Sequence, residues 1–352
     1  MSSLRAVLRG LGGAAGVATV LAGCDGSARA AGDGAPRVRT LTLGAYTTPR
    51  EVYRQELIPA FQKQWKERTG GEVRFQDSYL GSGAQARAIL GGFEADVAAL
   101  SLEPDIEAIR KAGLITRDWK AGARRGMVSR SIVVIGVRPG NPKRIRDWED
   151  LRRPDVEVLT PNPRTSGGAM WNIAAIHGAV LRGGTAAPKG SAPAAESLLR
   201  DVLRNVKIMD KGARESMLTF ESGVGDAIIT YENELLVSRK AGNQVEYVVP
   251  RSTILIENPV AVIDAYAEKN GRRDVADAFV EFLTTAEAQR AYTRYGLRAV
   301  DDSVAREANA SLPEVGDLFT IDDLGGWPEL TRQLFAPGGL FDRASAAGRN
   351  AR

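Results

Sequence analysis

Reactive and metal-binding side chains are scarce in this 352-residue chain. It has one cysteine, Cys24, so an internal disulfide is impossible, and its one histidine, His177, leaves no Cys/His cluster for zinc. His177 falls inside an expected helix, where a packed or surface histidine is far more common than a general base. There is no P-loop, and neither Ser82 nor Ser166 stands in a GxSxG elbow. The sequence thus offers little for an enzyme, and we expect neither a metal nor a cofactor.

The chain also has little excess of one sign of charge over the other. Lys and Arg total 47 and Asp and Glu total 43, which leaves a formal net charge of +4. That is a weak field for a chain of this length, so we expect no nucleic-acid partner. With 43% hydrophobic residues, the chain is long enough to fill two lobes with cores of their own.

The start of the chain reads as an export signal. A basic N-terminus precedes an apolar run over 11–21 that is too short to span a bilayer. The run closes with LAGC, which resembles the bacterial lipobox, in which cleavage precedes a cysteine that is then acylated. We therefore expect a lipoprotein signal peptide over 1–23, a lipid anchor on Cys24 outside the cytoplasm, in the periplasm or at the outer face of the cytoplasmic membrane, and a flexible tether over 24–37. An ordinary signal peptide with a chance cysteine is the alternative.

From residue 38 onward, the hydrophobic pattern switches repeatedly between strand and helix. Residues 38–45 alternate with a period of two, and 50–68 carry an apolar stripe with helical spacing. Similar pairs follow to about residue 295, and 251–262 read as an extended return crossing; the pattern over 300–341 is looser. This alternation predicts an α/β protein whose parallel sheets have helices on both faces.

Three loops combine small residues, Gly, Ser or Ala, with the start of an expected helix. Gly81-Ser82-Gly83, Ser166-Gly167-Gly168 and Gly212-Ala213 each follow an expected strand and open an expected helix. Helix N-termini expose unpaired N–H groups and a partial positive charge, and glycine lets an anion approach the backbone. Because ligands of open α/β sheets bind beyond the carboxyl ends of the strands, the three loops could form one anion site. Ser166 as an ordinary helix cap, with glycines that only shape the turn, is the alternative.

Several motifs match a known family in order and approximate spacing. They are YLGSGAQA, EADV, VRPGNPK, PNPRTSGGAMWN, DKGAR, YENE and FTIDDLGGW. Together they resemble the sulfate- and thiosulfate-binding proteins of bacterial ABC importers, over residues 41–341. The resemblance implies an α/β type II periplasmic-binding-protein fold, with two lobes of mostly parallel sheet and a ligand cleft between them. Lobe 1 would comprise 38–130 and 251–343, lobe 2 would comprise 131–250, and 344–352 would be a disordered tail.

Carried over residue by residue, the resemblance places seven residues around the oxyanion. The implied donors are the main-chain N–H groups of Thr47, Ser82, Gly167, Gly168 and Ala213 and the hydroxyl of Ser166. Thr47 stands where the family usually has Asp, and a main-chain contact survives that change. The seventh residue, Tyr231, replaces a family Trp whose indole N–H is a donor, which leaves the choice of oxyanion open.

Charged residues near these motifs are expected behind the site. In the family, charges such as those of Arg50 and Arg214 lie behind the loops and steady them without touching the ligand. Glu232 and Glu234 would repel a dianion, so we expect them to bond to backbone or to arginine.

The resemblance implies that the chain captures sulfate and delivers it to an ABC permease, as a monomer. Another oxyanion (thiosulfate, molybdate or phosphate) and, in a different class, a periplasmic hydrolase on the same scaffold are the alternatives.

Overall fold

The computed structural model describes residues 38–309 and 312–350. The expected signal peptide, Cys24 and the expected tether lie outside the described residues. The strands are β1 Val38–Tyr46, β2 Glu72–Leu80, β3 Val97–Ala99, β4 Met127–Val137, β5 Val158–Leu159, β6 Val206–Ile208, β7 Ala227–Tyr231, β8 Glu246–Val248, β9 Ser252–Val262 and β10 Asp317–Phe319. The longer helices are α2 Ile58–Thr69, α3 Ser82–Leu90, α4 Glu103–Lys111, α5 Gly167–Arg182, α6 Ala192–Arg204, α7 Ala213–Glu221, α8 Glu232–Lys240, α10 Arg273–Leu283, α11 Ala286–Arg294, α12 Asp302–Asn309 and α14 Leu340–Asn350. The shorter helical segments are α1 Arg50–Val52, η1 Tyr53–Leu57, η2 Trp148–Arg152, α9 Asp264–Lys269, η3 Asp322–Leu324, α13 Gly326–Leu330 and η4 Thr331–Phe335.

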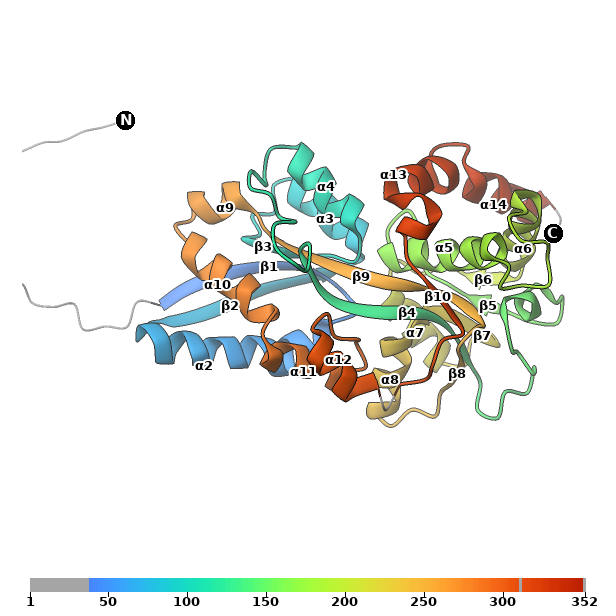
Figure 1. Ribbon diagram of the computed structural model, residues 1–352, viewed down its shortest axis with the longest axis horizontal. Helices are drawn as coiled ribbons and strands as arrows, with labels where there is room; N and C mark the ends of the chain where they lie inside the picture. The colour runs from blue at the N-terminus through green and yellow to red at the C-terminus, as the bar shows by residue number, and fades with distance from the viewer. Residues whose placement is uncertain (1–37, 310–311, 351–352) are drawn as a thin grey trace, which may run out of the picture. The chain divides into compact units, whose positions relative to one another are not determined.

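Two long strands, β4 and β9, connect two groups of parallel strands (Figure 1). The strand order is β2-β1-β3-β9-β4-β7-β5-β6, with β1 parallel to β2 and β3, and β5 parallel to β6 and β7. β9 runs antiparallel to β3, and β4 runs antiparallel to β7 and to β9. The expected parallel pairs are present, and the return crossing expected over 251–262 is β9.

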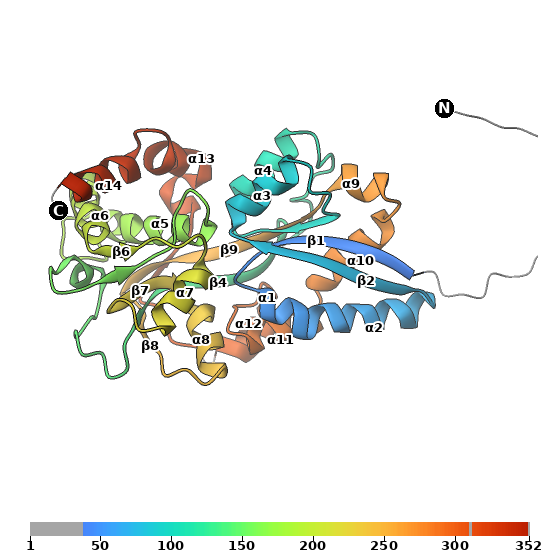
Figure 2. The ribbon, with the colours of Figure 1, turned by 180° about the vertical axis from the view of Figure 1, so that it is seen from behind.

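We call the two groups the first and the second lobe. The first lobe comprises 38–126 and 263–309, the second comprises 138–251 and 317–350, and β4 and β9 belong to both. In the first lobe, α2, α10 and α11 cover one face of the strands, and α3 and α4 cover the other (Figure 2). In the second lobe, α5 and α6 lie on one face, and α7 and α8 lie on the other. Each lobe therefore has helices on both faces of its strands, as the alternating pattern predicts.

The C-terminal segment packs on the second lobe, which corrects the expected assignment of 317–343 to the first. Strand β10 pairs with the start of β9, and α14 packs on α6. Trp327 stacks edge-on against Trp171 of α5, with ring centres 4.7 Å apart. Residues 344–350, expected to be a disordered tail, continue helix α14. The apolar residues of this segment specify a buried face, but the sequence does not say which lobe that face covers.

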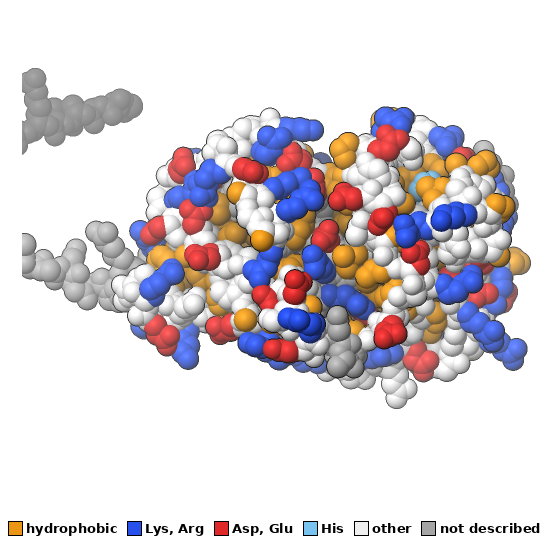
Figure 3. All heavy atoms as spheres, in the orientation of Figure 1, with side chains coloured by type: hydrophobic (Ala, Val, Ile, Leu, Met, Phe, Trp, Pro, Cys, Tyr) orange, Lys and Arg blue, Asp and Glu red, His pale blue; other side chains and the backbone are white. Residues whose placement is uncertain are grey.

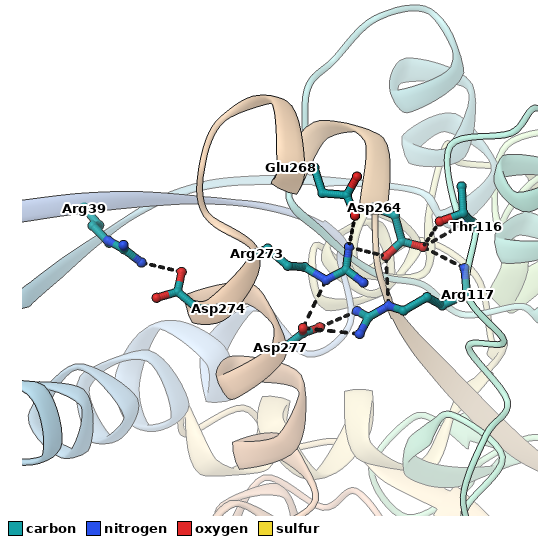
Figure 4. A network of polar contacts seen from close by, with 8 residues as sticks. All are labelled: Arg39, Thr116, Arg117, Asp264, Glu268, Arg273, Asp274 and Asp277. Carbon is teal, nitrogen blue, oxygen red and sulfur yellow. Dashed lines mark hydrogen bonds and ion pairs between the residues drawn. The ribbon is translucent and has the colours of Figure 1, made fainter.

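An ionic network joins α9 and α10 of the first lobe to the segment after α4 (Figure 4). Its members are Thr116, Arg117, Asp264, Glu268, Arg273 and Asp277. The Asp264 side chain is nearly fully buried and accepts hydrogen bonds from the backbone N–H groups of Thr116 at 2.6 Å and Arg117 at 2.9 Å. Arg273 Nη1 lies 2.9 Å from the same carboxylate.

Over the face of the molecule in Figure 3, basic and acidic side chains are interspersed, in keeping with the small net charge. Within residues 38–309 and 312–350, no helix combines the length and apolarity needed to cross a membrane.

Candidate oxyanion site

Every strand of the two parallel groups ends in the same region between the lobes. β1 ends at Tyr46, β2 ends just before Ser82, and β3 ends just before Ser101. On the second lobe, β7 ends at Tyr231, and the loops after β5 and β6 lead into α5 and α7. The carboxyl ends of parallel strands meet at one edge of a sheet, and ligands of such sheets bind beyond that edge. In this structure, these edges of the two lobes face each other.

Three helices begin at this edge. α3 and α7 start after Gly81 and Gly212, and neither helix has a side chain bonded to its first N–H groups. α5 is capped by Ser166, whose hydroxyl oxygen accepts from the N–H of Ala169 at 3.4 Å. An oxygen that accepts in this way keeps its own proton for donation. The first turns of α3 and α5 contain no acidic residue, so the positive ends of these helices are not neutralised from within.

A small cavity, with a volume of about 10 Å³ accessible to the centre of a water molecule, lies where the lobes meet. It is lined by Tyr46, Thr47, Thr48, Gly81, Ser82, Ser101, Ser166, Gly167, Gly168, Ala213 and Tyr231. All seven residues expected to surround the oxyanion are among them, from both lobes and from loops more than a hundred residues apart in sequence. The structure therefore brings the expected residues together, and their role in binding stays a prediction.

None of the residues lining the cavity carries a charge. Arg214 lies behind the Gly212-Ala213 loop: its Nη2 donates to Glu51 of the first lobe at 2.9 Å, and its Nη1 lies 3.1 Å from Glu234. Arg50 is exposed, with its guanidinium 5.8 Å from the ring of Tyr79. Neither arginine lines the cavity, as the resemblance implied.

The two glutamates of the YENE motif are fully buried and both face arginines. Glu232 receives two hydrogen bonds from Arg298, at 2.8 and 3.1 Å. Burial raises the pKa of Glu234 to about 7, although the nearby charge of Arg214 acts in the opposite direction. Both carboxylates thus lie outside the cavity, next to arginines, as expected.

Glycine is sterically required at the α5 end of the cavity. A β-carbon on Gly167 would lie 2.6 Å from the hydroxyl of Ser101, and one on Gly168 would lie 2.7 Å from the ring of Tyr231. Both distances are shorter than real side chains tolerate, because interiors are close-packed. The two glycines therefore let residues of both lobes close onto the backbone of α5.

Ser101 is a cavity residue that the sequence analysis missed. Its N–H donates to Ser82 Oγ at 3.0 Å, and its hydroxyl lies 2.6 Å from that of Tyr231. Ser82 Oγ in turn donates to Asp105 at 2.5 Å, and burial raises the pKa of Asp105 to about 6. The position of Ser101 just after a buried strand was a usable signal, but it has no neighbouring glycine to draw attention to it.

Direct contacts between the lobes surround the cavity. The indole N–H of Trp171 donates to the carbonyl of Ser101 at 3.1 Å, and the N–H of Ala84 donates to the carbonyl of Thr165 at 3.4 Å. With the Glu51–Arg214 pair, these contacts hold the lobes together around the cavity.

His177 lies on α5, away from the cavity lining, and its burial lowers its pKa to about 4. In the described part of the chain, no group of three or more His, Cys, Asp or Glu side chains is arranged to hold a metal ion.

Comparison with known proteins gives one consistent family. Residues 41–298 match the family model described as bacterial extracellular solute-binding protein. A sulfate-binding protein of Synechococcus elongatus is 42% identical over 93% of this chain and 92% of its own length. The sulfate-binding protein of Escherichia coli is 40% identical over 86% of this chain and 91% of its own, and the thiosulfate-binding protein of that species is 35% identical.

Comparison with solved structures gives the same result. The sulfate-binding protein SubI from Mycobacterium tuberculosis superimposes with a TM-score of 0.78 at 38% identity, covering 84% of this chain and 99% of that protein. A periplasmic thiamin-binding protein, at 14% identity and a TM-score of 0.65, shares the fold alone. These similarities confirm the predicted fold class.

Proposed function

Because this chain belongs to the bacterial extracellular solute-binding protein family, we propose that it binds sulfate in the cavity between its lobes and delivers it to the permease of an ABC importer outside the cytoplasm. Its relatives over most of the chain are sulfate- and thiosulfate-binding proteins, which makes it a binding protein rather than the alternative hydrolase. The observation that carries the proposal is the cavity itself, which is small, uncharged and surrounded by helix N-termini from both lobes.

Neutral donors suit a ligand that must be both bound and released. A buried dianion is costly unless its oxygens are hydrogen-bonded, and fixed N–H and O–H dipoles supply those bonds without a buried counter-charge. We propose that the main-chain N–H groups of Thr47, Ser82, Gly167, Gly168 and Ala213 and the hydroxyls of Ser166 and Tyr231 serve as these donors.

Entry and exit require the lobes to separate. The cavity is lined from both lobes, and the chain passes from one lobe to the other in the strands β4 and β9 and again between residues 309 and 317. We propose that the lobes move as two bodies about these strands, closing on sulfate and opening at the permease.

Titration calorimetry of the purified protein against sulfate, thiosulfate, molybdate and phosphate tests the proposal. We expect sulfate to bind most tightly. Tighter binding of thiosulfate or molybdate would make that anion the assigned ligand instead of sulfate. No binding of any of the four anions would overturn the proposed function.

We also propose that Cys24 becomes the lipidated first residue of the mature protein. The support is the lipobox-like LAGC that ends the N-terminal apolar run. Cys24→Ser should move the protein from the membrane fraction to the soluble or uncleaved pool and leave sulfate affinity unchanged. A processed Cys24→Ser protein that still fractionates with membranes would contradict the anchor.

We propose further that the protein works as a monomer, because its cavity is completed by residues of one chain. Sedimentation equilibrium with and without sulfate should give the monomer mass, and a dimer in either condition would contradict it.

A further inference from the structure

Two hydroxyl groups from opposite lobes meet at the wall of the cavity. Tyr231 Oη, at the end of β7, lies 2.6 Å from Ser101 Oγ, just after β3. Both side chains are 1% exposed and both line the cavity. We call these two groups the hydroxyl pair.

The backbone on both sides of Ser101 is fixed. Its N–H donates to Ser82 Oγ, and its carbonyl accepts from Trp171 Nε1 at 3.1 Å and from Asn258 Nδ2 at 3.3 Å. The Ser101 side chain packs against the backbone of Gly167, with its hydroxyl 2.6 Å from the point that a β-carbon there would occupy. Ser101 therefore holds a hydrogen-bond partner against the tyrosine whenever the lobes are closed.

The hydroxyl pair can be arranged in two ways, because each hydroxyl both donates and accepts. In one arrangement, Ser101 donates to Tyr231, and Tyr231 donates to an oxygen of the anion. In the other, Tyr231 donates to Ser101, and Tyr231 Oη accepts a hydrogen bond that an O–H group of the ligand donates. The second arrangement depends on Ser101, because without it the tyrosine proton would have no acceptor at the pair.

We propose that Ser101, acting as a positioning residue through Tyr231, allows the site to accept singly protonated tetrahedral oxyanions in addition to fully deprotonated ones. The site then takes fully deprotonated anions such as sulfate and also singly protonated ones such as hydrogen phosphate, which an indole at position 231 would reject because it only donates. Sulfate remains the preferred ligand. This inference rests on the proposed function and goes beyond it in naming the class of anions that enters.

Two pairs of anions of matched size test the inference. Sulfate and selenate carry no proton, whereas phosphate and arsenate carry one at about pH 8.5. Competition calorimetry on wild type gives the affinity ratio within each pair, sulfate over hydrogen phosphate and selenate over hydrogen arsenate. The ratio, unlike a single affinity, is insensitive to general loosening of the site.

Ser101→Ala should raise both ratios about tenfold and change sulfate affinity by less than about threefold, because only the protonated ligands lose the acceptor arrangement. Tyr231→Trp should raise the ratios at least as much and tighten sulfate binding. Tyr231→Phe should weaken sulfate about tenfold, because a donor to the anion is removed. Thr253→Val removes a buried hydroxyl that bonds to the carbonyl of Val133 away from the cavity, and should leave both ratios at the wild-type value.

Equal ratios in wild type, Ser101→Ala and Tyr231→Trp would overturn the inference. So would a Ser101→Ala protein that loses affinity equally for all four anions, since that result reports a structural role only. If Ser101→Ala does not fold, the test rests on Tyr231→Trp. Affinity ratios equal to those of wild type in that variant would then reject the role of the hydroxyl pair. Failure of wild type to bind sulfate and selenate would instead overturn the proposed function.

Discussion

Charged side chains fill the ionic network around Asp264, whereas none lines the cavity between the lobes (Figure 4). Both regions hold negative charge out of water, one permanently and the other, in our proposal, reversibly. Asp264 is part of the chain, so arginines and backbone N–H groups can be committed to it at close range. A transported anion must leave again, and a buried cation left without its partner would be costly at each release.

The same difference is seen between two aspartates of the first lobe, Asp264 in the network and Asp105 behind the cavity. Hydrogen bonds from Arg117 and Thr116, with the charge of Arg273, outweigh the effect of burial and lower the pKa of Asp264. Asp105, behind the cavity, is held by the Ser82 hydroxyl, and burial raises its pKa to about 6. The two aspartates thus differ in their bonded partners, since arginines contact Asp264 whereas the Ser82 hydroxyl donates to Asp105.

The largest expected effect comes from filling the cavity backbone. Gly168→Val places carbon atoms against the ring of Tyr231 and blocks the approach of an anion to the N–H groups, so sulfate affinity should fall more than about a hundredfold. Gly83→Ala is the matched control, since its β-carbon would lie 3.4 Å from the flexible end of Arg87, and it should bind within about twofold of wild type. Calorimetry measures both, and near-normal binding by a folded Gly168→Val would remove this loop from the site.

Breaking the network should affect stability and leave binding alone. Asp264→Ala leaves two backbone donors and two arginines without their acceptor, so the free energy of unfolding should fall by about 3 kcal/mol. The exposed Asp274, which pairs with Arg39 in Figure 4, is the control, and Asp274→Ala should cost no more than about 0.5 kcal/mol. Denaturant titration tests these values, and a large loss of sulfate affinity in Asp264→Ala would contradict the separation of the two regions.

Removing one neutral donor should cost less than filling the cavity. Ser166→Ala deletes a hydroxyl that we place on the anion, so sulfate binding should weaken by about 1.5–3 kcal/mol, because the acceptor is charged. The variant also loses the cap of α5, worth about 1 kcal/mol of stability. Calorimetry separates the two effects when circular dichroism shows an intact fold. Unchanged affinity would contradict the role of Ser166.

The smallest expected effect is the dependence of stability on pH, measured without sulfate. Asp264 has a lowered pKa when folded, so its contribution is present above its unfolded pKa of about 3.9 and is lost as the pH falls through the folded value. Asp105 has a raised pKa, so its contribution is present below about 3.9 and is lost as the pH rises through about 6.

Asp105→Asn keeps an acceptor for Ser82 and removes the titration. Between about pH 4 and 6, wild type should lose stability relative to this variant by on the order of 1 kcal/mol, allowing for the partial exposure of Asp105. Asp264→Asn should show the opposite trend, with wild type losing its advantage as the pH falls. Parallel pH profiles for the two variants would contradict the comparison.

The sequence by itself determined the local parts of this protein. Period-two and helical patterns located β1, the helical stretch through α2, and β9, because side-chain burial follows the backbone repeat. Glycine and serine marked the starts of α3, α5 and α7, because serine caps a helix N-terminus and glycine leaves the N–H groups there accessible. The seven expected site residues required the family resemblance as well, since no local signal singles out Thr47 or Tyr231.

Only the tertiary structure decided which separate parts meet. Trp327 and α14 have apolar faces that would suit either lobe, and packing against Trp171 and α6 placed them on the second. Ser101 carries no local motif, and it became a cavity residue only when the first lobe closed against Tyr231. A local pattern specifies how a segment folds and which face it buries, whereas its partner across the cavity is set by the packing of the whole chain.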